Sequence, residues 1–547
     1  GRIEQALQGR VSGVTIMQNS GQPGSPSTIR IRGITTFDES GNNPLWVVDG
    51  VVVDNGAMGY LNQNDIESIE VLKDAASAAI YGTRAATGVI LITTKKGKSG
   101  KMNVSYNGFY GISGPAKMVE VLNATQYATL LNERSVAGGG AVLFPNISTL
   151  GKGTDWQDAI FNNNAGRYSH EVSLSGGTDK STFYLSFGIQ DFEGIVTPEI
   201  SGYNRKSLRL NSTHKISQIF TVGQTLGYTH QKSKGLGNTN SEFGGPLSSA
   251  INLDPITPIV VTDPLVANGA PYNSNPVFRD ANGNPYGISS IVGQEMSNPV
   301  AYIQTRLGRH NWSDDFVGNA YLEAAITKDL KVRSTVGGKM AYWGNIGFTP
   351  RFYLSATIAA GQNNYGKGDN KSFAWNIENT ITYSKKISEH NFTLLLGQGS
   401  YVENIGRGTG ITLFNLPISN WQDASFDFDI PQANRTSGTD DFIEHKLTSL
   451  FTRLNYSFAD KYLFTGIIRR DGSTRFGGNN KFGVFPSFSV GWVVNRESFW
   501  PASDFLNTLK IRGGYGVVGN DGIPDFRYLA TISGGYNYAV GSGGGVT

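Results

Sequence analysis

The sequence of 547 residues predicts a mainly β fold, in which a small α/β domain precedes a large antiparallel β-barrel that spans a membrane. Three observations favour this fold. The first hundred or so residues mix helical and strand patterns, whereas the rest alternates apolar and polar residues with a period of two. Short and long links alternate between the later strands. Charged residues make up only 16% of the chain, below the roughly 25% usual for soluble proteins.

The composition excludes several classes of protein. The net charge of +3 is too small to indicate a nucleic-acid partner, and no basic stripe with interleaved aromatic residues is found. The absence of cysteine excludes disulfides, thiolate metal sites and cysteine nucleophiles. No apolar run approaches the ~18 residues of a membrane-spanning helix. Because Gly1 begins in mid-pattern without a methionine, we expect the N-terminal part of the first domain to be missing.

The N-terminal region is predicted to be a compact α/β domain over residues 1–100. "IEQALQGRVSGVTI" is typical of a short amphipathic helix that runs into a strand, and "STIRIRG" is typical of a strand. "PLWVVDGVVV" predicts two strands joined by a turn at Asp49-Gly50. In "DIESIEVLKDAASAAIYGTRAATGVILITTKKGK" a strand precedes a short helix, which Asp74 caps and Gly82 closes, and a buried strand follows.

From Met102 onward the pattern is that of β-strands with two different faces. For example, Phe183, Leu185 and Phe187 share one face of a strand, and Tyr184 and Ser186 share the other. About thirteen such strands are predicted. The predicted short links are residues 176–180, 213–218, 326–330, 385–390 and 458–461. The predicted long links are residues 112–166, 191–203, 231–311, 341–370, 404–443 and 471–482.

Short turns at one end and long loops at the other are the anatomy of transmembrane β-barrels. One link, near residues 495–507, is long where this alternation predicts a short one. Because single-chain bacterial barrels have an even number of strands, we expect the barrel over residues 101–547 to be incomplete at its C-terminal end.

Several strings resemble one protein family closely. "LQGRVSGVTI", "IRIRG", "PLWVVDGVVV" and the segment 65–98 resemble the plug domain of SusC/RagA-type TonB-dependent outer-membrane transporters. Further strings along the barrel are similar to the same family: "DWQDAIF" (155–161), "SLSGGTDKSTFYLSFG" (173–188), "RRDGSTRFGGNNKFGVFPSFSVGW" (469–492) and "LKIRGGYGVVGN" (509–520). The resemblance extends over nearly the whole chain.

This resemblance implies a plug inside a barrel of about 22 strands, of which about thirteen are covered. It also implies the outer membrane of a Gram-negative bacterium, a SusD-like lipoprotein lid and energy from the TonB complex. The expected function is uptake of a large nutrient, an oligosaccharide or an oligopeptide, whose identity the sequence does not give. The family's TonB box would lie upstream of Gly1, so energy coupling is assigned to no residue here. Residues 95–101 are expected to tether the plug to the first barrel strand.

Three plug arginines, Arg30, Arg32 and Arg84, are candidate latch residues that pair with carboxylates of the barrel wall until the plug is pulled. By strand parity Glu171 and Glu323 face the lumen and are the candidate partners. The alternative is that these arginines simply face a water-filled lumen.

Aromatic residues are the candidates for contact with the ligand. In the plug, Trp46 faces either an external cavity or the core of the domain. Aromatic residues of the long links either stack on sugar rings, pack against a lid protein or hold their own loops in place. These residues are Tyr272, Phe278, Tyr286, Trp343, Phe352, Tyr353 and Tyr365.

The remaining motifs favour neither a metal site, a cofactor nor an enzyme. Asp49-Gly50 and Asp471-Gly472 are typical turn dipeptides. "DANGNP" (280–285) resembles part of a calcium loop but lacks the required glycine and glutamate, which favours an external turn. No HExxH, GxSxG or P-loop pattern occurs. A barrel enzyme and a non-transporting adhesin or scaffold are the alternative functions.

Overall fold

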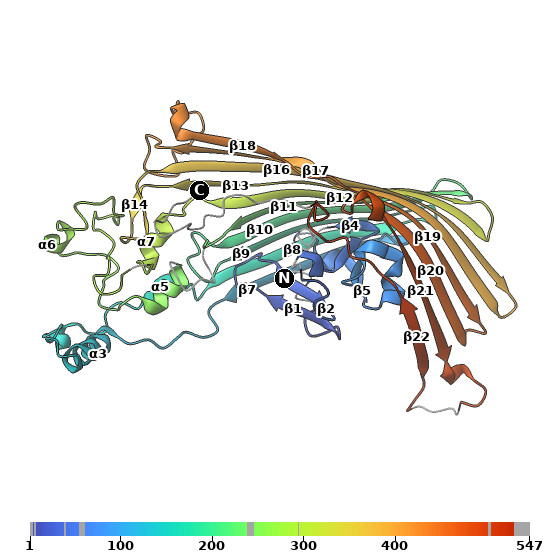
Figure 1. Ribbon diagram of the computed structural model, residues 1–547, viewed down its shortest axis with the longest axis horizontal. Helices are drawn as coiled ribbons and strands as arrows, with labels where there is room; N and C mark the ends of the chain where they lie inside the picture. The colour runs from blue at the N-terminus through green and yellow to red at the C-terminus, as the bar shows by residue number, and fades with distance from the viewer. Residues whose placement is uncertain are drawn as a thin grey trace, which may run out of the picture.

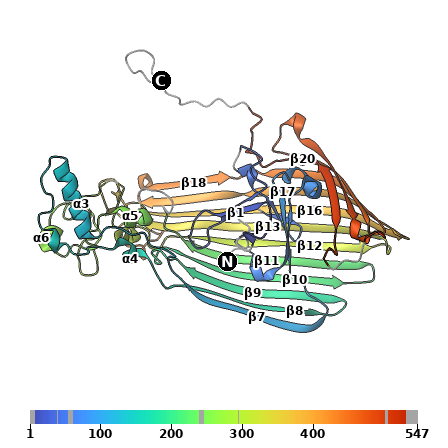
Figure 2. The ribbon, with the colours of Figure 1, turned by 90° about the horizontal axis from the view of Figure 1, so that it is seen from below.

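The computed structural model describes residues 4, 7–37, 40–53, 59, 61–237, 245–293, 295–500 and 505–529. A sheet of fourteen strands forms a strongly curved wall, and the N-terminal α/β domain lies against its concave face (Figure 1). Figure 2 shows the same arrangement from below, with the long strands β7 to β13 running side by side.

The N-terminal domain contains two small sheets. A hairpin of β1 and β2 stands apart from a four-stranded sheet with the order β4-β3-β6-β5. The strands are β1 Val14–Gln18, β2 Ser27–Ile31, β3 Leu45–Val48, β4 Val51–Val53, β5 Ile66–Leu72 and β6 Val89–Thr94. The helices named below are η3 Gln63–Asp65, α2 Ala75–Ala78 and η4 Ala79–Arg84. This sequence of elements confirms the predicted strand–helix–strand unit at residues 65–98.

In this domain the predicted turn at Asp49-Gly50 is confirmed, whereas the predicted helix cap at Asp74 is wrong. Asp49 and Gly50 join β3 to β4 with φ of 49° and 86°, as the turn prediction requires. Gly82 also has a positive φ, of 59°. Asp74 stands at the N-terminus of α2 but does not cap it with its side chain, because its carboxylate pairs with Arg32 at 2.6 Å.

The wall consists of antiparallel strands in chain order. They are β7 Gly100–Ser113, β8 Ala165–Gly177, β9 Ser181–Glu193, β10 Gly202–Lys215, β11 Phe220–Lys234, β12 His310–Ala325, β13 Leu330–Thr349, β16 Asn364–Ile387, β17 His390–Phe414, β18 Arg435–Asp441, β19 His445–Phe458, β20 Tyr462–Ser473, β21 Phe482–Val493 and β22 Lys510–Gly516. Thirteen of them follow one another from β7 to β22, and β18 pairs with the outer part of β17. The strands β7 and β22 do not pair, so the described part of the wall is an open barrel.

The two faces of the wall have opposite chemistry. On β9, Leu185 and Phe187 point outward and are 37% and 48% exposed, whereas Tyr184 and Ser186 face the N-terminal domain and are buried. On β10 the outward Leu208 likewise alternates with inward polar side chains. On these strands the apolar residues therefore form the convex face and the polar residues surround the N-terminal domain, which is the arrangement expected of a plug in a membrane barrel.

The links alternate as predicted, with two corrections. The short links are residues 178–180, 216–219, 326–329, 388–389 and 459–461, and the link from 494 to 509 is long, as the sequence indicates. The predicted long links 341–370 and 404–443 are too long, because β13, β16 and β17 continue well past the predicted ends. Those extensions are rich in glycine and polar residues, so the apolar alternation that marks the lower strands is absent there.

Apart from the link 494–509, the long links gather at one end of the wall (Figure 1). They contain α3 Ala124–Ala137, α4 Trp156–Ile160, α5 Pro246–Asn252, α6 Pro264–Ala267, α7 Pro299–Gln304, and the short strands β14 Phe352–Tyr353 and β15 Ala359–Ala360. Trp156 and Ile160 of α4 pack with Leu253 and Ile303 in a hydrophobic core of this end, which fixes the loops to one another.

None of the described helices has the length and apolar character needed to cross a membrane.

Candidate functional site

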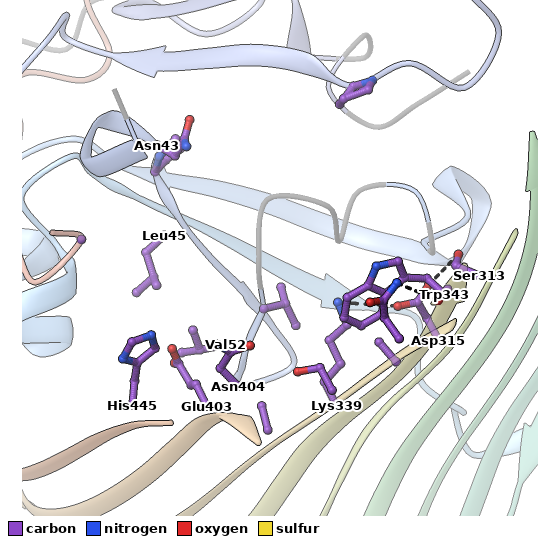
Figure 3. Close-up of a pocket in the computed structure, with 18 of the residues that line it drawn as sticks. Asn43, Leu45, Val52, Ser313, Asp315, Lys339, Trp343, Glu403, Asn404 and His445 are labelled. Carbon is purple, nitrogen blue, oxygen red and sulfur yellow. Dashed lines mark hydrogen bonds and ion pairs between the residues drawn. The ribbon is translucent and has the colours of Figure 1, made fainter. Parts of the chain in front are cut away.

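A central cavity of about 1090 Å³ lies between the N-terminal domain and the inner face of the wall (Figure 3). On the domain side it is lined by residues 22–26, 43–45, 52–53 and Arg84. On the wall side β12, β13, β16, β17 and β19 contribute side chains, and so do residues 520–522, which follow β22. Its volume is slightly larger than the range of about 300–1,000 Å³ for ligand pockets.

Aromatic and amide side chains contribute to the lining of the central cavity. Trp312 and Trp343 come from the neighbouring strands β12 and β13, and the ring of Trp343 stacks on Phe442 with a centroid distance of 5.9 Å. Amides both donate and accept hydrogen bonds, and aromatic faces pack against apolar faces of a ligand. The amides are Gln22, Asn43, Gln231, Asn311, Asn345, Asn370, Asn404 and Asn520.

Two cations of the central cavity, Lys339 and Arg84, pair with carboxylates that also line it. Lys339 lies 3.6 Å from Asp315, which also accepts a hydrogen bond from Ser313 at 3.1 Å (Figure 3). Arg84, on η4 of the N-terminal domain, lies 3.1 Å from Glu403 on β17. Each of these cations is therefore compensated by a protein carboxylate, and the cavity presents mixed charge rather than a field of one sign.

Arg84 connects the cavity to the N-terminal domain. Its guanidinium lies over the ring of Tyr401, 4.3 Å from the ring centroid, in addition to its ion pair with Glu403. Burial works to lower the pKa of Arg84, but the charge of Glu403 and of the other anions around it outweighs burial and raises the pKa. The side chain therefore stays charged and is held in place by the wall.

Outside the central cavity, Arg209 of β10 joins the wall to two carboxylates of the N-terminal domain. It lies 3.5 Å from Asp49 and 3.8 Å from Asp65, and all three side chains are almost fully buried. Asp49 also accepts hydrogen bonds from the backbone N–H and the hydroxyl of Thr94 at 3.0 and 2.6 Å. Asp65 also accepts a hydrogen bond from Tyr184 at 2.9 Å. The turn at Asp49-Gly50 thus places a carboxylate against the wall.

A second junction lies on β20. The fully buried Asp471 accepts hydrogen bonds from the backbone N–H of Thr83 at 2.8 Å and from Arg469 at 2.7 Å. Arg469 also donates to the backbone carbonyl of Ile80. The prediction of a turn at Asp471-Gly472 is wrong, because both residues lie inside β20. The dipeptide is a turn signal only where the chain must reverse, and here the strand continues.

The segment that follows β22 folds inward and pairs with the same part of the N-terminal domain. The backbone N–H of Gly519 donates to the carbonyl of Gly82 at 3.3 Å, and the backbone N–H of Asp521 donates to the carbonyl of Thr83 at 2.8 Å. Burial raises the pKa of the Asp521 carboxyl more than the neighbouring Arg84 and Arg475 lower it. Residues 82–86 are therefore held from two sides, by β20 and by this segment.

Comparison with known proteins identifies the architecture. The family model described as TonB-dependent Receptor Plug Domain matches residues 1–89. The chain is 32% identical over 544 residues to the TonB-dependent receptor SusC of Bacteroides thetaiotaomicron, a match that covers 96% of this chain and 51% of SusC. Over nearly its whole length the chain is therefore similar to SusC-type TonB-dependent receptors, and because of this similarity the protein is called the receptor below. Its N-terminal domain is accordingly the plug.

Further comparisons show the same similarity. The receptor is also 32% identical over 549 residues to the TonB-dependent receptor P26 of Formosa agariphila, covering 96% of this chain and 50% of P26. The chain thus spans about half the length of these two relatives. Among solved structures, the RagAB peptide importer in its "open-open" state has the same fold, with a TM-score of 0.80 and 23% identity. That match covers all of this chain and 60% of the importer chain.

The predicted latch residues of the receptor are not paired with one another. Arg84 does contact the wall, but its partner is Glu403, which corrects the expectation that Glu171 pairs with it. Glu171 faces inward as predicted, and there it accepts a hydrogen bond from Asn62 of the plug. Glu323 pairs with Lys331 and Arg333 of the neighbouring wall strand β13.

The other two plug arginines make contacts within their own domain. Arg30 donates to the side chain of Asn43 at 2.6 Å, and Arg32 pairs with Asp74. Neither contact crosses to the wall, so a role of Arg30 and Arg32 in a plug–wall latch remains only a prediction.

The aromatic candidates for ligand contact lie in three different environments: the central cavity, the plug core and the long links. Trp343 lines the central cavity. Trp46 does not, because it is 2% exposed and packs in the plug core, so the core alternative of its two predicted environments is confirmed and it is not a ligand-facing residue. In the long links, the ring of Phe278 stacks on Phe352 at 6.1 Å, and the backbone N–H of Tyr353 donates to Pro276 at 3.0 Å. These contacts hold one loop to another.

The remaining loop aromatics make contacts of the same kind. Tyr272 is buried, and its hydroxyl accepts a hydrogen bond from the backbone of Ile288 at 2.9 Å. Tyr286 forms an isolated β-bridge with Val260, and Tyr365 stacks on Phe426. The loop "DANGNP" is a tight turn, as predicted, in which Asp280 accepts from the backbone of Asn282 and Asn284.

Sequence analysis missed the residues that connect plug and wall most closely. Arg205 and Arg209 alternate on β10 with the outward Leu208, so strand parity already places both guanidinium groups in the lumen. Arg205 donates to the plug carbonyls of Gly59 and Leu61 at 3.1 and 2.9 Å. Arginines on the inward face of a predicted wall strand are therefore the sequence feature that indicates these contacts with the plug.

Proposed function

We propose that the receptor imports a nutrient that is too large for passive pores across the outer membrane of a Gram-negative bacterium. The cargo is an oligosaccharide or an oligopeptide. The observation that carries this proposal is the central cavity of about 1090 Å³, because it lies between the plug and the wall on the side of the long loops. Cargo bound there is blocked by the plug and passes only when the plug moves.

The transport cycle consists of binding, closure and plug displacement. Cargo binds among the tryptophans and amides of the central cavity, and a SusD-like lipoprotein closes over the long loops. The TonB complex then pulls on the plug and displaces it. No bond of the cargo is made or broken, so the receptor acts by conformational gating rather than as an enzyme.

The chemistry of the plug–wall junction supports such a movement. The wall presents Arg205, Arg209 and Asp471 to the plug, all of them buried and hydrogen-bonded. When the plug moves, water enters the lumen and hydrates these groups. The loss of protein hydrogen bonds is thereby largely offset by hydrogen bonds to water, whereas an apolar junction would expose apolar surface to water.

Uptake by whole cells tests the proposal. A strain that lacks the receptor is complemented with the full-length gene and supplied with fluorescent oligosaccharides and oligopeptides. We expect accumulation of at least one class, which stops when a protonophore collapses the proton-motive force. A cell-surface adhesin would retain its ligand under the same treatment, and that result would exclude transport.

A further inference from the structure

A second cavity, here called the side cavity, adjoins the central one. Its volume is about 650 Å³, and it lies along the outer parts of β13, β16 and β17. Gln22, Asn311 and Asn345 line both cavities. A chain-like molecule in the central cavity can therefore extend into the side cavity without leaving the receptor.

Two arginines between α7 and β12 line the side cavity and contact only neutral groups in the described part of the chain. The Nε of Arg306 donates to the backbone carbonyl of Gly235 at 3.3 Å. The Nε of Arg309 donates to the carbonyl of Phe348 at 3.2 Å, and its Nη2 donates to the hydroxyl of Thr349. No carboxylate of the described residues forms an ion pair with either guanidinium, in contrast to Arg84 and Lys339 of the central cavity.

Positive charge is concentrated in the side cavity. Burial lowers the pKa of Arg309, and the positive charge of Arg306 lowers it further. Lys367, on the opposite side of the cavity, is already compensated by Asp369 at 2.8 Å. The two arginines therefore form an uncompensated pair of like charges, which an anion between them would stabilise.

The opposite wall leaves room for such a group. Gly347 pairs with Gly366, and Gly368 pairs with Gly410, on adjacent strands that line the side cavity. A Cβ atom at position 347 would lie 2.8 Å from Cγ of Arg309, so the side chain of Arg309 occupies its position because residue 347 is glycine. At position 410, by contrast, no atom lies within 4 Å of the Cβ position, so the wall there is open to a bound group.

We propose that the side cavity is an anion subsite, in which Arg306 and Arg309 bind a sulfate or carboxylate group carried by the cargo. A guanidinium offers planar, paired donors that match the oxygen atoms of both anions. The subsite rests on the proposed function, since the anion belongs to the transported molecule, and it narrows the cargo to acidic oligosaccharides or acidic oligopeptides.

Titration calorimetry with the purified full-length receptor in detergent tests the subsite with two matched pairs of probes. One pair is a sulfated hexasaccharide and its desulfated form. The other is a glutamate-containing octapeptide and its glutamine counterpart. We expect the anionic member of one pair to bind roughly tenfold more tightly or better, because hydrogen bonds to charged groups are the strong class. The pair that shows the preference identifies the source of the anion.

The variant Arg306→Gln should reduce the affinity of the anionic probe to that of its neutral counterpart. This variant loses a single hydrogen bond to the described chain, and retained circular dichroism shows that it folds. Arg351→Gln is the matched control, since Arg351 is exposed near the same outer end and lines neither cavity. Its preference for the anionic probe should equal that of the unmodified receptor.

Three results would overturn the subsite: equal affinity for both members of both pairs, no binding of any probe, or an unchanged preference in Arg306→Gln. Proton-motive-force-dependent uptake of the neutral probes by whole cells tests transport separately. Such uptake without an anion preference refutes the subsite alone, whereas an anion preference without any energised uptake refutes the transport function.

Discussion

The carboxylate of Asp471 on β20 accepts a hydrogen bond from the backbone N–H of Thr83 at 2.8 Å, and so joins the wall of the receptor to its plug. The donor is a main-chain group, so the contact depends on the path of the plug backbone rather than on the side chain of Thr83. That path is set one residue earlier, where Gly82 has a φ of 59°. The junction is therefore sensitive to the size of residue 82.

The substitution Gly82→Ala should release the plug from β20. A Cβ atom at this position would lie 1.8 Å from Oδ2 of Asp471, and the positive φ disfavours any side chain. We expect a loss of about 1–3 kcal/mol in the free energy of plug docking, the range for overpacking of a buried site. Ion conductance in planar bilayers would measure it, as an increase caused by partial opening of the lumen.

Gly33→Ala is the matched control for Gly82→Ala. Gly33 also has a positive φ, of 96°, but no atom lies within 4 Å of the Cβ position. It therefore reports backbone strain without the collision. If both variants conduct equally, the contact with Asp471 does not hold the plug.

Removal of the guanidinium of Arg209 should weaken the plug more than removal of an exposed arginine. In Arg209→Met the buried carboxylates of Asp49 and Asp65 lose their common cation, which is expected to destabilise docking by about 3–5 kcal/mol. Arg333→Met removes a half-exposed partner of Glu323 and should change stability by less than about 1 kcal/mol. Urea titrations of the two variants give the comparison, and equal midpoints would contradict it.

The sequence predicts the fold of the receptor well and its contacts only in part. Alternation in residues such as Leu185 and Ser186 is local information, so the strands, their faces and the short turns follow from it. The partner of Arg84 is not local, because Glu403 lies 319 residues away and reaches the plug through the curvature of the wall. The environment of Trp46 is not local information either, since a hydrophobic ring suits a core and a cavity equally.

A double-mutant cycle on Arg84 should distinguish its two candidate partners. Coupling between Arg84→Gln and Glu403→Gln is expected to be about 0.5–3 kcal/mol, the range for residues in contact. Coupling between Arg84→Gln and Glu171→Gln should be close to zero, because Glu171 contacts Asn62 instead. Significant coupling only to Glu171 would show that the plug docks differently in the membrane.

The link between β21 and β22 should be sensitive to acid. Hydrogen bonds from Trp492, Tyr462 and Lys461 to Glu497 lower the pKa of this carboxyl from 4.5 to about 2. Because the pKa is lowered in the folded state, the stabilising contribution is complete above pH 4.5 and is lost as the pH falls towards 2. Exchange of the Trp492 indole N–H, followed by NMR, should accelerate over this interval.

Glu497→Gln provides the control for the acid effect, because its amide oxygen accepts the indole hydrogen bond without titrating. The exchange rate of Trp492 should then vary with pH only as the intrinsic rate does. A midpoint near pH 4.5 in the unmodified receptor would mean that the carboxylate is not held by its three donors.

Trp343 should contribute to cargo binding and little to stability. Its ring lines the central cavity and stacks on Phe442, whereas Trp46 is enclosed in the plug core. Trp343→Ala is expected to weaken binding by about 1–3 kcal/mol, roughly 5- to 150-fold in affinity, if the ring stacks on the cargo. Trp46→Ala should instead lower stability by about 3–5 kcal/mol, the loss typical of a buried aromatic side chain. Calorimetric binding and thermal unfolding of both variants separate these effects, and unchanged affinity in Trp343→Ala would place the cargo elsewhere in the lumen.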